Sequence, residues 1–267
     1  MKWFFCFFCL LFWSLLIASD RIPLNPSINQ PQIDIYPENR ESFRVEIRFP
    51  DLILTDTLQN AIVWSQLLIN GMGSSGEIGS PQLPQTVRLF AIEKSGDYAA
   101  EFLSADIVEY SGISVFPAQP KPIRDNGSNA FQIDYSVYQQ NRWYPEAMVS
   151  DQNEAILREQ RILPVGVYPV QFNPVVKKMR IARSLSFRVS LKSGRGENVM
   201  LTGPNIPSRS FIPLYKNFID NFSFSDMVAY GETPGLPDML IITHDQFYQT
   251  VIPFAEWKRQ KGIPCEI

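Results

Sequence analysis

The feature that most constrains the fold of this chain is a period of two in its apolar residues. Between residues 178 and 191 every second residue is apolar, and only Arg183 interrupts the series. Successive side chains of a β-strand point to opposite faces, so this period predicts a strand with one buried face. The same alternation predicts strands at 43–49 and 131–138. Further apolar runs predict strands at 61–69, 87–92, 98–110 and 167–172.

Turn residues separate these strands and suggest how they pair. Asn173-Pro174 is a turn dipeptide, so the strands on either side of it are expected to form a hairpin. Short strands at fairly regular spacing, divided by Pro and Gly, are typical of antiparallel sandwiches. We therefore predict a mainly β fold with an antiparallel β-sandwich over residues 41–200. Residues 154–161 fit either a strand or a short helix.

The first residues of the chain have the composition of an export signal. Lys2 precedes an apolar run at 3–17 and small residues follow it, so residues 1–19 are predicted to be a signal peptide. The run is shorter than the roughly 20 residues that span a membrane, which argues against a stable membrane anchor. We expect a protein that is secreted or held at the cell surface. Residues 20–40 are rich in Pro, Asn and Gln and are expected to be an extended lead-in rather than a packed element.

Composition argues against several classes of site. The net charge is −3 and the basic residues are scattered, so no nucleic-acid partner is expected. A single histidine argues against a His-based metal site and against a complete catalytic triad. Cys6 and Cys9 lie within the predicted signal peptide, so Cys265 is left alone and no internal disulfide is expected. We find no sequence pattern for a cofactor site.

Prolines and glycines mark residues 201–237 as a linker between two domains. Within this linker the stretch 211–224 is apolar and aromatic, with Lys216 and Asp220 on its other side. We expect a short helix there that packs on a neighbouring element.

The last residues have the pattern of a different fold class. Residues 239–242 are wholly apolar, as in strands buried on both faces, and Asp245 is expected to be the N-cap of the helix that follows. Gly262 fits the position after the C-cap of that helix. Four apolar residues can share one helical face: Phe247, Val251, Phe254 and Trp257. A β-α-β unit needs further elements to cover it, so we expect residues 238–267 to be the truncated start of a longer α/β domain.

Five short stretches, taken in order, resemble one protein family. Leu-Ile-Ile-Thr-His at 240–244 and Phe-Ala-Glu-Trp-Lys-Arg-Gln-Lys-Gly at 254–262 look like the opening of a catalytic domain. Upstream stretches that are similar to a propeptide are Gly-Ser-Pro-Gln-Leu-Pro at 79–84, Val-Phe-Pro-Ala-Gln-Pro at 115–120 and Tyr-Pro-Val-Gln-Phe-Asn-Pro at 168–174. The family is that of the gingipain-like cysteine peptidases. The resemblance covers most of residues 40–267.

This resemblance implies that the chain is the N-terminal part of a secreted zymogen. In this family the propeptide is a β-sandwich that covers the active site until it is cut away. The catalytic domain has a caspase-like α/β fold, in which a cysteine thiolate attacks the peptide carbonyl and a histidine handles the proton. The implied partners are the chain's own downstream catalytic domain and, through that domain, protein substrates. Calcium is expected only in the downstream domain, and this chain is expected to hold no catalytic, cofactor or metal residue.

His244 and Cys265 are the only candidates within the chain for the His–Cys pair of the family. His244 follows the first strand of the C-terminal unit, whereas Cys265 begins the second, so a parallel sheet places them at opposite ends. A strand of about five residues spans roughly 17 Å, which is far beyond hydrogen-bond reach. We therefore interpret His244 as a residue beside a helix cap and Cys265 as a small apolar strand residue.

The resemblance also suggests residues for inhibition. Propeptides of this family can insert a basic side chain into the specificity pocket of the enzyme. Arg124 lies in a loop at 117–129 that is rich in Pro, Gly and Asn, and Arg195 lies between two glycines. Either could be the inserted side chain, and an ordinary solvated turn residue is the alternative interpretation for each.

Maturation requires a cut between the two domains. The chain has no Lys or Arg between Lys216 and Lys258, so a trypsin-like cut at 229–237 is excluded. Cleavage after Arg209 or Lys216 would satisfy such a specificity. Otherwise the enzyme does not cut after basic residues, or the prodomain stays attached.

Two other functions remain open from the sequence. A secreted β-sandwich binding or adhesion module without peptidase activity would be favoured if Trp64 and Trp143 were exposed on one face, whereas core positions would argue against it. An inactive relative of the family, whose later domain has lost its catalytic pair, is the third interpretation.

Overall fold

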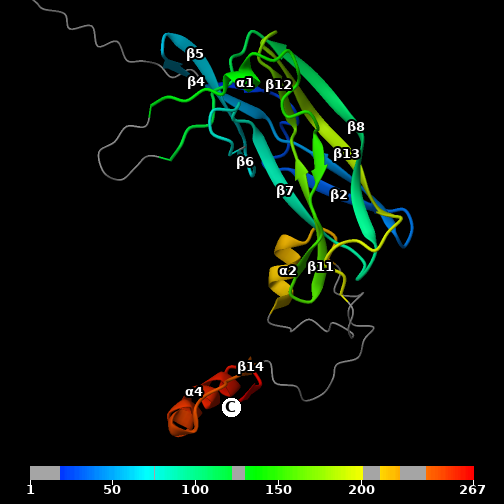
Figure 1. Ribbon diagram of the computed structural model, residues 1–267, viewed down its shortest axis with the longest axis vertical. Helices are drawn as coiled ribbons and strands as arrows, with labels where there is room; N and C mark the ends of the chain where they lie inside the picture. Colours follow the sequence, from blue (N-terminus) through cyan, green and yellow to red (C-terminus); the bar gives the residue numbers. More distant parts are fainter. Residues whose placement is uncertain (1–18, 75, 122–129, 201–210, 223–238) are drawn as a thin grey trace, which may run out of the picture.

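The chain is mainly β, as the alternating pattern predicts. The computed structural model describes residues 19–74, 76–121, 130–200, 211–222 and 239–267. Their strands form three antiparallel sheets and one short parallel pair. Figure 1 shows the long strands of the antiparallel sheets running beside one another through the body of the molecule.

The longest strands organise the first sheet. β13 (Lys178–Lys192) pairs along one edge with β8 (Asp97–Ser111) over its whole length. Its other edge is divided, because its start pairs with β12 (Val170–Asn173) and the rest with β3 (Ser42–Arg48). β2 (Gln32–Pro37) pairs with β3 beyond it. The hairpin predicted around Asn173-Pro174 is confirmed in β12 and β13.

Arg183, the residue that breaks the alternation in β13, coincides with a bulge. The register between β13 and β8 shifts between Ala182 and Ser184. The Arg183 side chain is 44% exposed, 3.7 Å from Asp106, while its carbonyl accepts a hydrogen bond from the Phe49 amide. The bulge therefore keeps a charged residue out of the core without ending the strand.

The second sheet repeats this arrangement. β11 (Gln160–Val167) pairs along one edge with β7 (Pro84–Ala91), and its other edge is divided between β10 (Ala155–Leu157) and β9 (Val149–Asp151). The short strand β6 (Gly73–Ser74) pairs with the start of β7. The segment that fits either helix or strand by sequence is thus a β-hairpin in the structure.

The third sheet has the order β1-β4-β5, with β1 (Ser19–Ile22), β4 (Leu52–Gln59) and β5 (Ile62–Ile69). β1 and β2 both fall within the region expected to be an unpacked lead-in, and Ile22 is only 3% exposed. That expectation is wrong, because the region contributes strands to two sheets. Three prolines and two asparagines lie between β1 and β2, whereas Pro37 is the last residue of β2 and Asn39 follows it.

The first and second sheets pack face to face around an apolar core. Phe90 of β7 contacts Phe43 of β3 and Phe187 of β13, with ring centroids 5.6 and 5.8 Å apart. Val45 and Ile47 of β3 are fully buried in the same cluster. Each such side chain contributes roughly 1.5–3 kcal/mol by leaving water. This packing makes the predicted sandwich.

Two short helices interrupt the β structure. The strand predicted at 131–138 is wrong, since α1 (Tyr135–Tyr138) forms there. The Asp134 carboxylate accepts a hydrogen bond from the Ser136 amide at 2.9 Å, and this N-cap overrides the period of two. The short helix expected within the linker is confirmed as α2 (Ile212–Phe218).

The C-terminal unit is a β-α-β element, as predicted. β14 (Met239–Leu240) pairs in parallel with β15 (Cys265–Glu266). A 3-10 turn, η2 (Asp245–Phe247), and the helix α4 (Tyr248–Gln260) connect them.

The details of this unit differ from expectation in three ways. His244, not Asp245, is the N-cap, and its Nδ1 atom accepts a hydrogen bond from the Gln246 amide at 3.2 Å. Residues 239–242 are not buried on both faces, since Ile242 is 89% exposed and β14 pairs only with β15 among the described strands. The aromatic helix face is also largely exposed, and Ala255 is the buried residue of α4. Gly262 has φ of +77°, as the predicted helix end requires.

Candidate functional site

One amide side chain closes the base of the loop that carries Arg124. Gln119 Nε2 donates a hydrogen bond to the Gln132 carbonyl at 2.9 Å, and Gln119 Oε1 accepts one from the Gln132 amide at 3.0 Å. The side chain therefore pairs with the opposite segment as a strand backbone would. Arg124 itself lies outside the described residues, but both ends of its loop are tied together.

The loop base rests on a rigid platform. The Gly79 amide donates to the Ala118 carbonyl at 2.7 Å, and the Gly79 carbonyl accepts from the Asp134 amide at 2.9 Å. Gly79 has φ of +85°, and a Cβ atom there would lie 2.8 Å from the Asp134 nitrogen, so a side chain does not fit. Close to the end of the loop, Phe131 contacts the rings of Trp64 and Phe116.

Arg195, the second candidate for insertion, lies in an exposed turn. The Gly96 amide donates a hydrogen bond to the Arg195 carbonyl at 2.9 Å, which ties this turn to the segment before β8. A Cβ atom on the adjacent Gly196 would lie 2.1 Å from the Gly96 carbonyl oxygen. The turn therefore requires glycine beside Arg195, and the Arg195 side chain points from a fixed backbone into solvent.

A buried ion pair supports the Arg195 turn from below. Arg161 is 1% exposed and its guanidinium donates hydrogen bonds to the carbonyl oxygens of Glu93, Gly96 and Glu197 at 2.8–3.1 Å. It also lies 3.1 Å from the Glu154 carboxylate. One side chain thus joins β11, the segment before β8 and the segment after β13.

The Glu154 carboxylate stays ionised in this site. Burial alone would raise its pKa, but hydrogen bonds from the Tyr98 and Glu197 amides and the charge of Arg161 together lower the pKa below its usual range. Its two oxygens accept those amides at 2.9 and 3.0 Å. A charged carboxylate with filled hydrogen-bond positions is a structural anchor and not a proton-transfer group.

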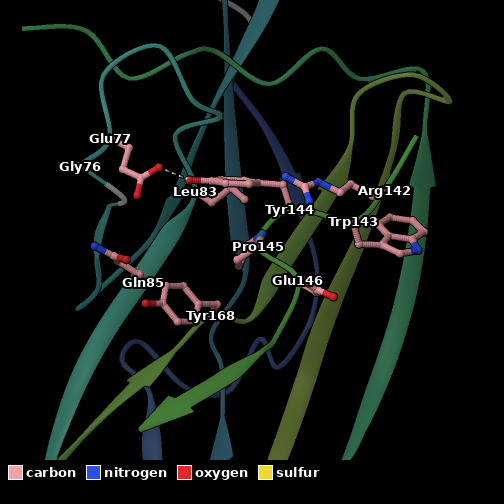
Figure 2. Close-up of a pocket in the computed structure, with 10 residues that line it drawn as sticks. All are labelled: Gly76, Glu77, Leu83, Gln85, Arg142, Trp143, Tyr144, Pro145, Glu146 and Tyr168. Carbon is pink, nitrogen blue, oxygen red and sulfur yellow. Dashed lines mark hydrogen bonds between the residues drawn. The ribbon is translucent and has the colours of Figure 1, made fainter. Parts of the chain in front are cut away.

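A cavity of about 490 Å³ opens between the loop after Gly76 and the segment before β9. Figure 2 shows Tyr144, Pro145 and Tyr168 along its walls, with Glu77 facing the Tyr144 hydroxyl. Burial raises the pKa of the Tyr144 phenol, which stays protonated at neutral pH. The residues that line this cavity include no cysteine, serine or histidine.

The two tryptophans considered for an adhesive surface are not both exposed. Trp64 is 5% exposed and contacts the rings of Phe131 and Tyr138. Trp143 is half-buried at the cavity, where the Arg180 guanidinium lies 4.0 Å from its ring centroid. These positions do not form one exposed aromatic face.

The remaining predicted site residues are scattered. Arg209 lies outside the described residues, and Lys216 has an exposed side chain within α2. Cys265 is 4% exposed and pairs in register with Met239 at the start of β14, whereas His244 caps the helix beyond the end of that strand. The structure therefore does not bring His244 and Cys265 to one place.

The described parts of the chain hold neither a cluster of metal ligands nor a helix suited to cross a membrane. No group of three or more His, Cys, Asp or Glu side chains there is placed to hold a metal ion. None of the helices in those parts has both the length and the apolar character needed to cross a bilayer.

Comparison with known proteins identifies the family of this chain. A family model described as Propeptide_C25 matches residues 26–202, which is more than half of the sequence. The chain belongs to this propeptide family. The matched propeptide region contains the Gln119–Gln132 hydrogen bonds, the Gly79 turn and the Arg161–Glu154 pair.

Curated relatives of the propeptide come from Porphyromonas gingivalis. Gingipain R2 is 24% identical over 89% of this chain, and Lys-gingipain is 21% identical over 85% of it. Gingipain R1 is 25% identical over 72% of the chain. The chain spans 32% of the length of gingipain R2 and smaller shares of the other two. It is thus a gingipain-like peptidase propeptide followed by the β-α-β unit.

Two solved structures share the fold. One, described as the complex of Porphyromonas gingivalis RgpB pro- and mature domains, has a TM-score of 0.63 at 21% identity. It covers 72% of this chain and 98% of the matched chain. The other concerns zymogenic latency of gingipain K from the same organism, with a TM-score of 0.55 at 19% identity over 66% of this chain and 100% of the matched one.

Sequence reasoning missed the residues that hold the candidate site together. Gln119 bonds a segment 13 positions away, and Arg161 bonds carbonyls 36 to 68 positions away. Neither residue has a local pattern that distinguishes it from a surface residue. The one available signal for Arg161 is the mainly apolar run 162–167 that follows it in the same strand.

Proposed function

We propose that this chain is the export signal and inhibitory propeptide of a gingipain-like cysteine endopeptidase, whose catalytic His–Cys pair lies downstream of Ile267. The observation that carries the proposal is the match of residues 26–202 to the propeptide family. The fold similarity to a prodomain solved in complex with its mature domain supports it. The proposed partner is the chain's own catalytic domain, and protein substrates are reached through that domain.

Inhibition in this proposal is steric and depends on a loop whose base is fixed. A loop with a fixed base loses less conformational entropy on docking than a free segment does, so its contacts contribute more to affinity. The Gln119–Gln132 pairing fixes the base of the Arg124 loop, and the buried Arg161 fixes the backbone of the Arg195 turn. Arg124 is the preferred candidate for insertion, because a long loop reaches further into a pocket than a tight turn.

A hydrolysis assay tests this function. The purified chain after its predicted signal peptide is added to the cognate mature peptidase, and hydrolysis of a peptide substrate is followed. Inhibition at or below micromolar concentration is expected, and an unchanged rate at that concentration contradicts the proposal. Arg124→Ala is expected to weaken inhibition by about 10- to 100-fold, the range for a central basic anchor. Arg195→Ala is the matched comparison, and Lys121→Ala at the loop base is the control.

Export and maturation complete the proposal. We propose that residues 1–19 direct secretion, with the product released or held at the cell surface, and that cleavage after Arg209 or Lys216 begins maturation. N-terminal sequencing of the exported protein tests both, because it reads the first residue after each cut. A mature N-terminus outside these positions would contradict the proposed cuts. The position of Lys216 within α2 favours Arg209, because a peptide bond in a helix must unfold before a protease can cut it.

A further inference from the structure

Residues 211–222, which we call the clasp, lie against the outer face of the second sheet. The clasp consists of Phe211, α2 and the four residues after α2. Tyr215 and Ile219 are 0% and 2% exposed and form a cluster with Ile162 of β11. Figure 1 shows α2 beside the end of β11. Partly buried residues that complete the cluster are Leu89, Ala91, Ala155, Leu157, Phe211, Leu214 and Phe222.

The clasp also supplies the hydrogen bonds that one edge of β7 needs. Ile219 forms a parallel bridge with Leu89, and the Asp220 amide donates to the Leu89 carbonyl at 2.9 Å. Asn221 then pairs with Ala91 through its side chain, since Oδ1 accepts from the Ala91 amide at 2.7 Å and Nδ2 donates to its carbonyl at 2.8 Å. At residues 89–91 of β7, β11 is the only described strand that pairs with β7, and it occupies the opposite edge. The clasp therefore closes an edge that is otherwise open.

Charged groups hold both ends of the clasp. The Arg88 guanidinium donates two hydrogen bonds to the Asp220 carboxylate, one of them at 2.8 Å, and the Asp220 side chain is only 13% exposed. At the other end the Tyr215 hydroxyl donates to the Glu159 carboxylate, and the Arg158 guanidinium lies 3.7 Å from the ring centroid of Phe211. Bidentate pairs between Arg and a carboxylate are among the stronger charged contacts in proteins.

In the sequence, the proposed cleavage site at Arg209 lies between the clasp and the strands that the clasp contacts. The clasp follows Arg209, and the propeptide match ends at residue 202, while every contact partner of the clasp on β7, β10 and β11 lies within the match. Hydrolysis of the Arg209–Ser210 bond, in which water gives a carboxylate on Arg209 and an amino group on Ser210, therefore leaves the clasp on the downstream fragment.

We propose that the clasp is a docking segment that keeps the two fragments bound after a cut at Arg209, so that such a cut alone does not release the propeptide. Its occupied surface is the outer face and open edge formed by β7 and the β10–β11 hairpin. Release then requires either a second cut after Phe222 or detachment of the clasp. The inference takes its biological setting from the proposed maturation, but the binding itself needs no peptidase.

The test uses the full chain with a recognition sequence for a sequence-specific protease placed at residues 203–209. After complete cutting, the fragments are expected to co-elute in size-exclusion chromatography at submicromolar concentration and to separate in denaturant. Separation of the wild-type fragments at that concentration overturns the proposal. No cognate enzyme takes part, so this outcome leaves the proposed inhibitory function standing, and failed inhibition in the hydrolysis assay leaves the clasp standing.

Variants identify the contacts responsible. The double variant Asp220→Ala, Asn221→Ala is expected to raise the dissociation constant of the cut fragments at least about tenfold, since two hydrogen-bonded anchors are lost. Asn217→Ala, on the exposed side of α2, is the matched control and is expected to match the wild type.

Hydrogen exchange in the cut wild-type chain gives a second readout that does not depend on the variants. The Ala91 amide, which donates to Asn221, is expected to stay protected after the cut. Rapid exchange there, or retention in the double variant as tight as in the wild type, contradicts the proposal.

Discussion

The outer faces of the two packed sheets differ in the side chains that they carry and in what contacts them. On the first sheet, Arg188 of β13 lies 2.7 Å from Glu38 and 3.8 Å from Glu101, and Arg48 of β3 lies 2.9 Å from Asp34. These cross-strand ion pairs are at least 30% exposed and form a ladder in water. On the second sheet Leu89, Ala91 and Ile162 belong to an apolar part of the face that the clasp covers, whereas Val87 on the same face is 49% exposed. The outer face of the first sheet is therefore in contact with solvent, whereas the outer face of the second sheet is in part an interface between chain segments.

The same contrast separates two kinds of ion pair. The ladder pairs are exposed and contribute little, because water screens them and their long side chains lose freedom. The Arg161–Glu154 pair, at the end of the second sheet, is 0% and 5% exposed in its side chains and has every polar atom engaged in a network. Loss of one partner there leaves a charge buried without compensation.

The largest effect is expected from breaking the buried pair. Arg161→Ala leaves three carbonyls without this donor and the Glu154 carboxylate without its cation, and is expected to lower the free energy of unfolding by about 3–5 kcal/mol. Denaturant unfolding followed by circular dichroism measures this. Arg183→Ala, whose side chain lies 3.7 Å from an exposed Asp106, is the control. Equal losses in the two variants would refute the contrast between buried and exposed pairs.

Removal of the main apolar contact of the clasp should have the next largest effect. Tyr215→Ala deletes a ring that is 0% exposed, and is expected to lower the free energy of opening around Leu89 by about 3 kcal/mol, near the low end for buried aromatic residues. Hydrogen exchange of the β7 amides measures it. Phe218→Ala on the same helix, where the ring is 56% exposed, provides the comparison and should change the exchange little.

Acid should weaken the second sheet by a smaller amount. The pKa values of Glu154 and Glu159 are lowered in the folded chain from an ordinary value of 4.5, so their stabilisation is present above that value and is lost as the pH falls through the folded values. For Glu159 burial opposes ionisation, but hydrogen bonds from Tyr215 and Arg158 outweigh it. Unfolding measured from about pH 6 down to about pH 3 should show a decline in stability that is shallower in Glu159→Gln than in the wild type. An identical slope in the variant would argue against the role of Glu159.

The smallest effect is expected on the ladder. Arg48→Ala removes one exposed pair and should change the free energy of unfolding by less than about 1 kcal/mol. Thermal unfolding at low salt and at about 1 M salt measures it, because screening at the higher salt should remove most of the difference. A loss that is large and independent of salt would mean that the ladder is structural.

The sequence predicts those elements that a simple period governs. β13 and β3 follow from alternation and β8 from an apolar run, whereas most of β11 is not predicted as a strand. The strand β2 also alternates, through Ile33 and Ile35, but the surrounding Pro and Asn residues obscure it. At 131–138 a local N-cap competes with the period and decides the structure. The alternation alone does not show whether the strand preference or the helix cap is the stronger effect.

The candidate site is less predictable for a physical reason. The basic residues Arg124 and Arg195 are found by composition, and glycines beside Arg195 suggest a turn. The groups that fix their loops, Gln119 and Arg161, act through backbone atoms far away in the sequence. Only the folded chain brings those atoms together, so no local pattern predicts them.

Because Cys265 is buried, the rate at which its thiol is alkylated measures how often the surrounding structure opens. After the predicted signal peptide Cys265 is the one thiol in the sequence, and it is 4% exposed at the start of β15. An alkylating reagent can reach the sulfur only when the short parallel pair separates. The rate of labelling therefore reports how often the β-α-β unit opens around Cys265.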